Sequence, residues 1–407
     1  MVNRNFLCIF FRIFLAVLAL GLFSCGGAPR ETLPREERFS IGIGKMEDEI
    51  DIFQFQQVAA LSETSLYMRD GIFYVGSGSS FKVMEFTSHG DILSMYYNPD
   101  ENPQPVILQD ASAGGARSNR RAYPYAFHSV GNIAVSGAKM LYVEDLLPRE
   151  REVTDEKLGI KLNKIILRFE NGEYRGYLGQ DGIGGIPFPF IQSLHILKDD
   201  EISVLCRTMT DWIVFWFSAG GERLAAVRIS AENLPAPEGE GVFANLETII
   251  PDYAEKVLYL KIDYYREGKD GPTGIKYGIE DSISRIYRFD AGTSRYDGFL
   301  DIPQNVRRER GGNLFEMQDV RYSYEFIGVA AGGNFFLKSR EEGNVHQLLI
   351  LAQNGHVLRR RDLAVEDSQL LFSVFHVSPE GILSALLASE TGARVVWWRS
   401  DALLEGI

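Results

Sequence analysis

The feature of this chain that most constrains its fold is a pattern that recurs six times between residues 83 and 398. Each copy has four mainly apolar residues and then a polar turn, usually with Gly. The copies are Val83–Phe86, Ile166–Phe169, Val214–Phe217, Ile286–Phe289, Leu348–Leu351 and Val395–Trp398. Gly and Asn supply the positive φ that tight turns require, so each copy predicts a β-hairpin.

Further strand-like runs precede the hairpins. Ser193–Leu197 and Ile202–Cys206 come before the third copy, and Phe372–Val377 and Ile382–Leu387 come before the sixth. Four short strands per copy, repeated along the chain, are typical of a β-propeller. A single four-stranded sheet cannot cover both its faces, whereas sheets stacked in a closed ring cover every face and leave no exposed end. We therefore predict an all-β, six-bladed β-propeller.

The last copy ends close to the C-terminus, so the final blade lacks a strand from that part of the chain. We expect an early segment, either Phe39–Ile43 or Ile50–Phe53, to complete it. The copies end 47 to 83 residues apart, whereas compact blades take about 40–45 residues. Insertions must absorb the difference, and seven blades stay an alternative to six.

Two stretches carry a resemblance to a known family. They are the opening Phe39–Gly44 and the glycine-rich segment Leu178–Phe188, which contains Pro187. Over residues 39–404 the chain resembles the six-bladed β-propellers of the NHL-repeat type. Some propellers of that kind bind a metal in the central channel and catalyse hydrolysis or lyase chemistry, so the resemblance implies a metal-dependent hydrolase or lyase as an alternative function.

The N-terminal segment predicts export. An apolar run, Ile13–Ser24, follows Arg4 and Arg12 and ends at Cys25, and no acidic residue precedes Glu31. A charged start, a short apolar core and a small residue at its end are typical of a secretory signal peptide. The tetrad from Leu22 to Cys25 resembles a bacterial lipobox in the loose form of spirochaetal lipoproteins. That resemblance implies cleavage before Cys25 and lipid attachment to Cys25.

Two alternatives remain for this segment: an ordinary signal peptide with an incidental Cys, and an uncleaved membrane helix. Arg12 interrupts the apolar stretch, and the remainder is too short to span a bilayer comfortably. We expect a lipoprotein signal peptide at 1–24, a tether at 25–38 and the propeller at 39–407. The expected location is the cell envelope, and Gly26 in place of Asp after Cys25 favours the outer membrane over the inner one.

The net charge argues against a nucleic-acid partner, and the cysteine content argues against an internal disulfide. The formal net charge is −13, and removal of residues 1–24 takes away two Arg and no acid. Such a chain is unsuited to nucleic acid, whose binding requires clustered Lys and Arg. Cys206 is the one Cys left after Cys8 is cleaved off and Cys25 is lipidated, so the mature domain has no internal disulfide.

Three insertions separate the repeats: Asn98–Tyr125, Glu144–Lys164 and Arg266–Asp281. Long loops on a rigid scaffold commonly carry binding sites. Arg and Tyr are favoured at interfaces, and they cluster in the first insertion of this acidic protein. The predicted partner-contact loop comprises Arg117, Arg120, Arg121, Tyr123 and Tyr125.

No pattern in the sequence predicts catalysis. The six His residues share no metal-ligand spacing, and His195 and His376 lie in strand-like runs where a structural role is favoured. We predict no catalytic, cofactor-binding or metal-binding residues. The favoured function is a lipid-anchored module that binds or scaffolds a protein or glycan partner.

Lipidation gives a first test. In a bacterial host fed labelled palmitate, the full chain should incorporate the label and enter the detergent phase on phase separation. Cys25→Ser should lose both properties because no acyl acceptor remains, while Cys206→Ser should keep both. An unlabelled wild-type chain would contradict the prediction.

Overall fold

The computed structural model describes residues 31–52, 64–110, 120–156, 159–237, 242–269, 276–310, 317–341, 345–365 and 367–405. The chain divides into two compact units, Met1–Thr32 and Leu33–Ile407. The predicted signal peptide and lipid attachment at Cys25 lie outside the described residues. Short strand β1 (Thr32–Leu33) spans the boundary between the units. The described residues contain strands and short 3-10 turns but no α-helix.

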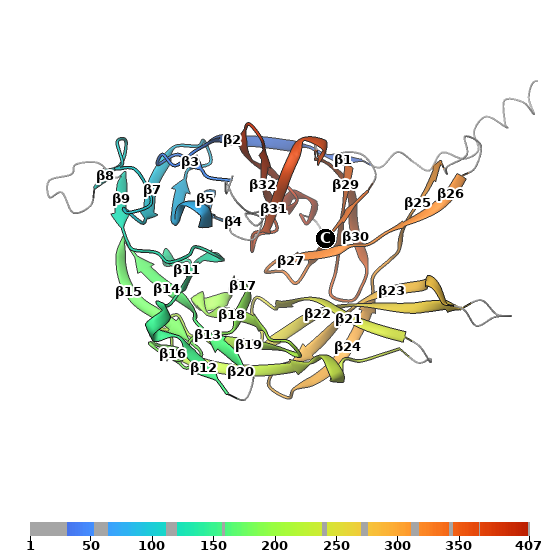
Figure 1. The fold of residues 1–407 in the computed structure, drawn as a ribbon. Coiled ribbons are helices and arrows are strands. Elements are labelled where there is room, and N and C mark those ends of the chain that lie inside the picture. The colour runs from blue at the N-terminus through green and yellow to red at the C-terminus, as the bar shows by residue number, and fades with distance from the viewer. Residues whose placement is uncertain are drawn as a thin grey trace, which may run out of the picture. The chain divides into compact units, whose positions relative to one another are not determined.

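The second unit is a ring of six antiparallel sheets (Figure 1). Blade 1 is β4 (Thr64–Arg69), β5 (Ile72–Ser77), β6 (Lys82–Phe86) and β7 (Ile92–Tyr97). Blade 2 is β10 (Ile133–Val135), β11 (Met140–Leu146), β14 (Lys164–Glu170) and β15 (Glu173–Gly179), with β16 (Gly182–Ile183) at its edge. Blade 3 is β17 (Phe190–Ile196), β18 (Ile202–Arg207), β19 (Asp211–Phe217) and β20 (Arg223–Ser230).

The remaining blades follow the same order. Blade 4 is β21 (Val242–Pro251), β22 (Val257–Lys269), β23 (Lys276–Asp290) and β24 (Arg295–Asp301). Blade 5 is β27 (Glu325–Val329), β28 (Phe335–Arg340), β29 (Val345–Leu351) and β30 (Val357–Ala364). Blade 6 is β31 (Leu370–Val377), β32 (Leu383–Ser389), β33 (Gly392–Trp398) and β2 (Arg35–Ile43), with β3 (Glu49–Ile50) beyond it.

The remaining elements lie between or beside the blades. The additional strands are β8 (Gln109–Asp110), β9 (Arg121–Pro124), β12 (Val153–Asp155), β13 (Ile160–Leu162), β25 (Asn305–Arg310) and β26 (Met317–Tyr322). The 3-10 turns are Gly78–Ser80, Arg149–Arg151, Lys198–Asp200, Ala231–Asn233, Asp367–Gln369 and Asp401–Leu403. Strand β9 pairs in parallel with β7 and with β8, so it extends blade 1 at its outer edge.

The six-bladed prediction is confirmed, and the seven-bladed alternative is wrong. Each of the six apolar tetrads lies on the third strand of its blade: β6, β14, β19, β23, β29 and β33. These strands are covered on both faces by the neighbouring blades, which is why their residues are apolar almost without alternation. Every residue of β19 is buried, including Trp216 and Phe217.

The ring closes through pairing between the two ends of the unit. Strand β2 pairs antiparallel with β33, with Phe39 opposite Val395 and Ile41 opposite Ala393. This confirms Phe39–Ile43 as the segment that completes the last blade, although the strand begins at Arg35, within the stretch predicted as tether. No hairpin follows the sixth tetrad: β33 leads into the turn Asp401–Leu403, because β2 already occupies the fourth position.

Antiparallel pairing gives the propeller two different ends. Connections between the first and second strands, and between the third and fourth, meet at one end and contain two to five residues. We call this the turn end. Connections between the second and third strands, and between successive blades, meet at the opposite end. We call this the insertion end because the extra pairs β12–β13 and β25–β26 and the extended tip of β22–β23 belong to it.

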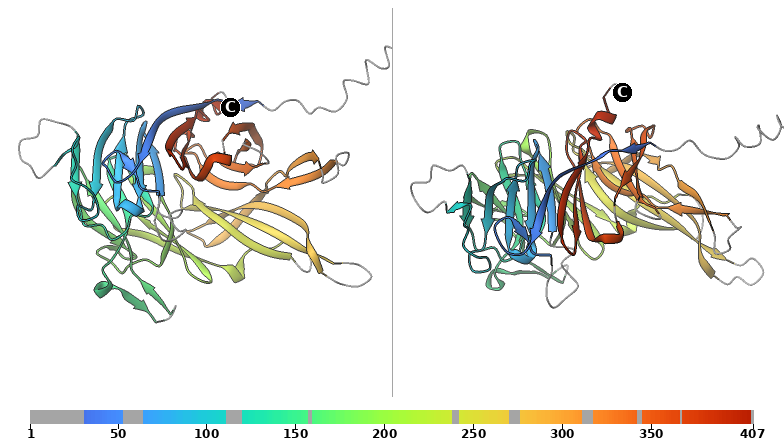
Figure 2. Two further views of the ribbon diagram at one scale, coloured as in Figure 1. Left: turned by 45° about the horizontal axis from the view of Figure 1, so that its top comes forward. Right: turned by 90° about the horizontal axis from the view of Figure 1, so that it is seen from above.

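The arms at the insertion end stand out from the blades (Figure 2). The predicted insertion Arg266–Asp281 coincides with the far part of the long hairpin formed by β22 and β23. The predicted insertion Glu144–Lys164 contains the pair β12–β13. Both insertions therefore include ordered strand pairs.

The strand that closes the ring gives a stability test. Ile41 on β2 is 2 % exposed and belongs to the same core cluster as Phe86 and Val395. Ile41→Ala should lower the free energy of unfolding by about 2–5 kcal/mol, since it removes buried methyl groups and leaves a cavity. Ser40→Ala, at the exposed neighbouring position, is the control and should change it by less than about 0.5 kcal/mol.

Urea unfolding of the full chain, followed by tryptophan fluorescence, measures both variants. Equal losses for the two substitutions would contradict a closing role for β2.

Candidate functional site

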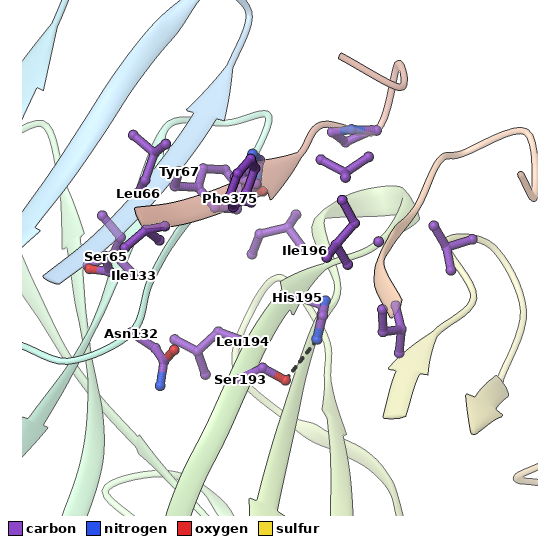
Figure 3. Close-up of a pocket in the computed structure, with 18 of the residues that line it drawn as sticks. Ser65, Leu66, Tyr67, Asn132, Ile133, Ser193, Leu194, His195, Ile196 and Phe375 are labelled. Carbon is purple, nitrogen blue, oxygen red and sulfur yellow. Dashed lines mark hydrogen bonds between the residues drawn. The ribbon is translucent and has the colours of Figure 1, made fainter. Parts of the chain in front are cut away.

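The innermost strands of all six blades surround one central channel (Figure 3). These strands are β4, β10, β17, β21, β27 and β31, each the first strand of its blade. The channel contains a cavity of about 270 Å³. Its position on the axis follows from the fold, because the first strand of every blade presents its free edge to the middle of the ring.

Aliphatic side chains form most of the channel wall. They include Leu66, Ile133, Leu194, Ile196 and Ile327. Among the described residues that line the channel, none is Asp, Glu, Lys or Arg. The polar side chains there are those of Thr64, Ser65, Tyr67, Asn132, Ser193, His195, Tyr253 and His376. The channel is therefore an apolar passage with a few uncharged hydrogen-bonding groups.

His195 lies near the end of β17 and points toward the channel, together with Ser193 (Figure 3). The two residues are two positions apart on one strand, so their side chains share a face. Ser193 Oγ and His195 Nε2 lie 2.9 Å apart in a hydrogen bond. Burial lowers the pKa of His195 to about 4, because the surrounding protein solvates an imidazolium poorly.

His376 lies on β31 and belongs to the same channel wall. Its ring centroid is 4.5 Å from that of Tyr67, at a tilt of 52°. Its Nδ1 atom is buried and has no hydrogen-bond partner within the described part of the chain. Burial, reinforced by the nearby His195, lowers the pKa of His376 to about 3. Both imidazoles are consequently neutral at pH 7.

Tyr67 completes this group of channel residues. It is buried, and burial raises its pKa to about 12. The phenol therefore stays protonated at neutral pH, and its hydroxyl accepts a hydrogen bond from Arg69 and keeps its own proton to donate. Together the two histidines, Ser193 and Tyr67 supply hydrogen-bonding groups without a formal charge.

The sequence did not predict this site. His195 and His376 are far apart along the chain and belong to different blades, so their convergence depends on ring closure. The available signal was that both lie on first strands, which the fold turns toward the axis. The first strands can be identified as channel-lining only when the strand register of each blade is known.

The predicted partner-contact loop lies at the outer edge of blade 1. Arg117 lies outside the described residues. Arg120 forms an ion pair with Asp91 at 3.0 Å, and its side chain is 43 % exposed. Arg121 begins β9 and is half-buried. These arginines are therefore at the rim of the propeller rather than on the arms of the insertion end.

The two tyrosines of this loop contribute to packing between blades 1 and 2. The ring of Tyr123 lies 5.0 Å from that of Tyr96. The ring of Tyr125 lies 5.0 Å from that of Phe169 on blade 2 and 5.4 Å from that of Tyr174. Aromatic pairs at these separations add stability beyond their buried area. Within the predicted partner-contact loop, the two tyrosines are thus half-buried between blades, whereas Arg120 lies at the exposed rim.

The described residues show neither a metal-binding cluster nor a membrane-spanning helix. There, no group of three or more His, Cys, Asp or Glu side chains is arranged to hold a metal ion. In the same part of the chain, no helix has the length and apolar character needed to cross a membrane. Cys206, the one free cysteine found there, is buried, and burial raises the pKa of its thiol.

Comparisons with known proteins give structural likeness without a family. No protein-family model and no curated protein matches the chain. Among solved structures, the chain is similar to the Dos1 propeller with 9 % identity and a TM-score of 0.35, over 83 % of this chain and 92 % of that one. It is also similar to a chain of the Chaetomium thermophilum Nup170 NTD–Nup53 complex, with 11 % identity and a TM-score of 0.39. That match covers 92 % of this chain and 63 % of the other, so this chain spans less than two thirds of its length.

The channel histidines give a pH prediction. Unfolded histidine has a pKa of about 6.5, whereas the folded chain keeps His376 neutral to about pH 3. Between these values the unfolded chain binds more protons, so stability should fall as the pH drops from 7 to 4. Among the described residues, the titratable groups that line the channel with His376 are His195, Tyr67 and Tyr253. Arg69 and Glu380 lie close to Tyr67, whose ring contacts His376.

His376→Gln should weaken this pH dependence, because glutamine does not titrate. His356→Gln, at an exposed turn, should leave the dependence unchanged. Unfolding midpoints between pH 7 and 4 provide the measurement. An identical pH dependence in wild type and His376→Gln would show that His376 titrates alike in both states.

Proposed function

We propose that this protein is a lipid-anchored module of the cell envelope that binds or scaffolds a protein or glycan partner at the insertion end of its propeller. The observation that carries this proposal is the distribution of the insertions. The pairs β12–β13 and β25–β26 and the extension of β22–β23 all belong to one end of the ring. Loops and arms on a rigid scaffold are common binding elements.

The position where the chain enters the ring supports this orientation. Arg35 at the start of β2 pairs with Trp398 at the end of β33, so the chain enters at the turn end. A lipid on Cys25 would be separated from Leu33 by a segment that spans at most about 30 Å when fully extended. Such a lipid would hold the turn end nearer the membrane and leave the insertion end free for a partner.

The arm β25–β26 has the surface chemistry of a contact element. Val306 pairs with Arg321, and Arg308 pairs with Asp319, so these four exposed residues share one face. Apolar and basic groups therefore lie together on an acidic protein. Arg is favoured at interfaces because it combines apolar contact with several donors.

The base of the same arm is fixed to blade 5. Asn305 Nδ2 donates to Glu341 Oε1 at 2.7 Å, and both residues are buried. Arg307 forms ion pairs with Glu341 and Asp362. A buried anchor of this kind limits the motion of the arm, so less entropy is lost when a partner binds.

Site-specific photo-crosslinking tests the insertion end. A photoreactive phenylalanine analogue at Val306 or Met317, which are 42 % and 48 % exposed, should yield a discrete adduct in intact cells. Leu224 is 47 % exposed and begins β20 at the turn end, so it is a matched control that should yield none. An adduct at Leu224 alone, or at none of the three positions, would contradict the proposal.

A second contact is proposed at the rim, through Arg120 and Arg121. Arg120→Glu with Arg121→Glu should lower the yield of the crosslinked adduct about two- to fivefold, because reversing rim charges slows association. Arg223→Glu is the control, since Arg223 pairs with Asp181 at 2.9 Å and has the same 43 % side-chain exposure as Arg120. Equal adduct yields from the double variant and the control would contradict a contact between the rim and the partner.

A further inference from the structure

We propose that the central channel binds a small uncharged molecule that has an apolar body and one hydrogen-bonding group such as a hydroxyl or carbonyl. This site is independent of the partner surface at the insertion end. The proposal rests on the wall of the channel, on its charge, and on the polar groups gathered around His195 and His376.

The wall selects for an apolar body. Aliphatic residues from all six blades line the cavity: Leu66, Ile133, Ile196, Ile250, Ile327 and Val374 are examples. A site of this kind gains affinity by removing apolar ligand surface from water. The cavity of about 270 Å³ exceeds the roughly 150 Å³ at which an apolar cavity in another protein admits benzene. A ring of six carbons with a substituent therefore fits the available volume.

The charge of the wall selects against ions. No Asp, Glu, Lys or Arg is found among the described residues that line the channel. A charged ligand would lose its hydration on entry and meet no opposite charge in return. The same argument applies to a dication, which two neutral imidazoles would leave without charge compensation. The ligand class is accordingly uncharged.

The polar groups require a hydrogen-bonding partner. The buried Nδ1 atom of His376 has none within the described residues. A neutral imidazole nitrogen either donates or accepts, so a hydroxyl or carbonyl on the ligand can satisfy it. Leaving such a buried group unpaired is energetically unfavourable, which favours an occupant that reaches it. Ser193 and His195 already bond each other and add a second polar point on the facing blade.

Three probes that share a cyclohexane ring test the proposal: cyclohexanol, cyclohexylamine and cyclohexanecarboxylate, which are neutral, cationic and anionic at pH 7. Each is titrated into the full chain in detergent, and the Cε1–H signals of His195 and His376 are followed by NMR. Signals are assigned from His195→Gln and His376→Gln. The exposed His356 provides an internal reference.

Cyclohexanol should shift both channel signals in a saturable way and leave His356 unchanged. The two charged probes should bind at least about tenfold more weakly. Absence of saturable shifts with cyclohexanol, or equal affinity for all three probes, would overturn the proposal.

Variants whose larger side chains fill the channel provide a second test of where cyclohexanol binds. Ser193→Phe should abolish the shift of His376 by cyclohexanol, and Ile327→Trp should do so from another inner strand. Circular dichroism verifies that each variant is folded. One folded variant of the two is enough for the test. Comparison in the same detergent removes the contribution of the micelle. Retention of the cyclohexanol shift in a folded, filled variant would place binding elsewhere and overturn the proposal.

Discussion

The pairing between β2 and β33 is the interaction on which the rest of the structure depends. Six stacked sheets bury their faces only if the first and last are neighbours, and this pairing makes them so. Phe39 and Ile41 contribute side chains to the core between blades 6 and 1, alongside Phe73, Phe86 and Val395. Closure therefore supplies both backbone hydrogen bonds and apolar burial, and it fixes the diameter of the channel.

The same closure separates the chemistry of the axis from that of the surface. The first strands face inward with aliphatic residues and neutral imidazoles, whereas Arg308 and Asp319 on the arm β25–β26 and the side chain of Arg120 at the rim are exposed. A chain with a net charge of −13 thereby encloses a channel whose described lining carries no formal charge. The two surfaces therefore differ in chemical character, uncharged along the axis and charged on the exposed arm and rim.

Sequence reasoning predicted the parts of the fold that depend on local patterns. The apolar tetrads are nearly continuous because third strands are covered on both faces, and each tetrad was found on such a strand. The closing strand was predicted by counting strands, since the C-terminal part of the chain supplies only three strands for the sixth blade. The turn after Trp398 was wrongly predicted as a hairpin by analogy with the other five copies, although Arg399 to Asp401 contain no Gly. Nothing in the local sequence indicates that β2 occupies the fourth position.

The sites were less accessible to the same reasoning. His195 and His376 meet through a ring that no short stretch encodes, and the sequence favoured a structural role for both. Tyr123 and Tyr125 were predicted as partner contacts from their composition. The structure packs their rings beside Tyr96 and Phe169 and leaves both half-buried, so the partner contact stays a prediction. Composition indicates which residues suit an interface, but it does not distinguish an interface between blades from one between proteins.

The closing strand also has a consequence for synthesis. Ile41 must wait about 350 residues for its partner Ala393, although the entropy of closing so long a loop grows only logarithmically. Until then β2 is a lone strand with an open edge, which invites wrong pairing. The first four residues of β2, Arg35 to Arg38, are all charged and lack the apolar–polar alternation of a typical strand. Charged residues on an open strand edge disfavour such wrong pairing before the last blade is in place.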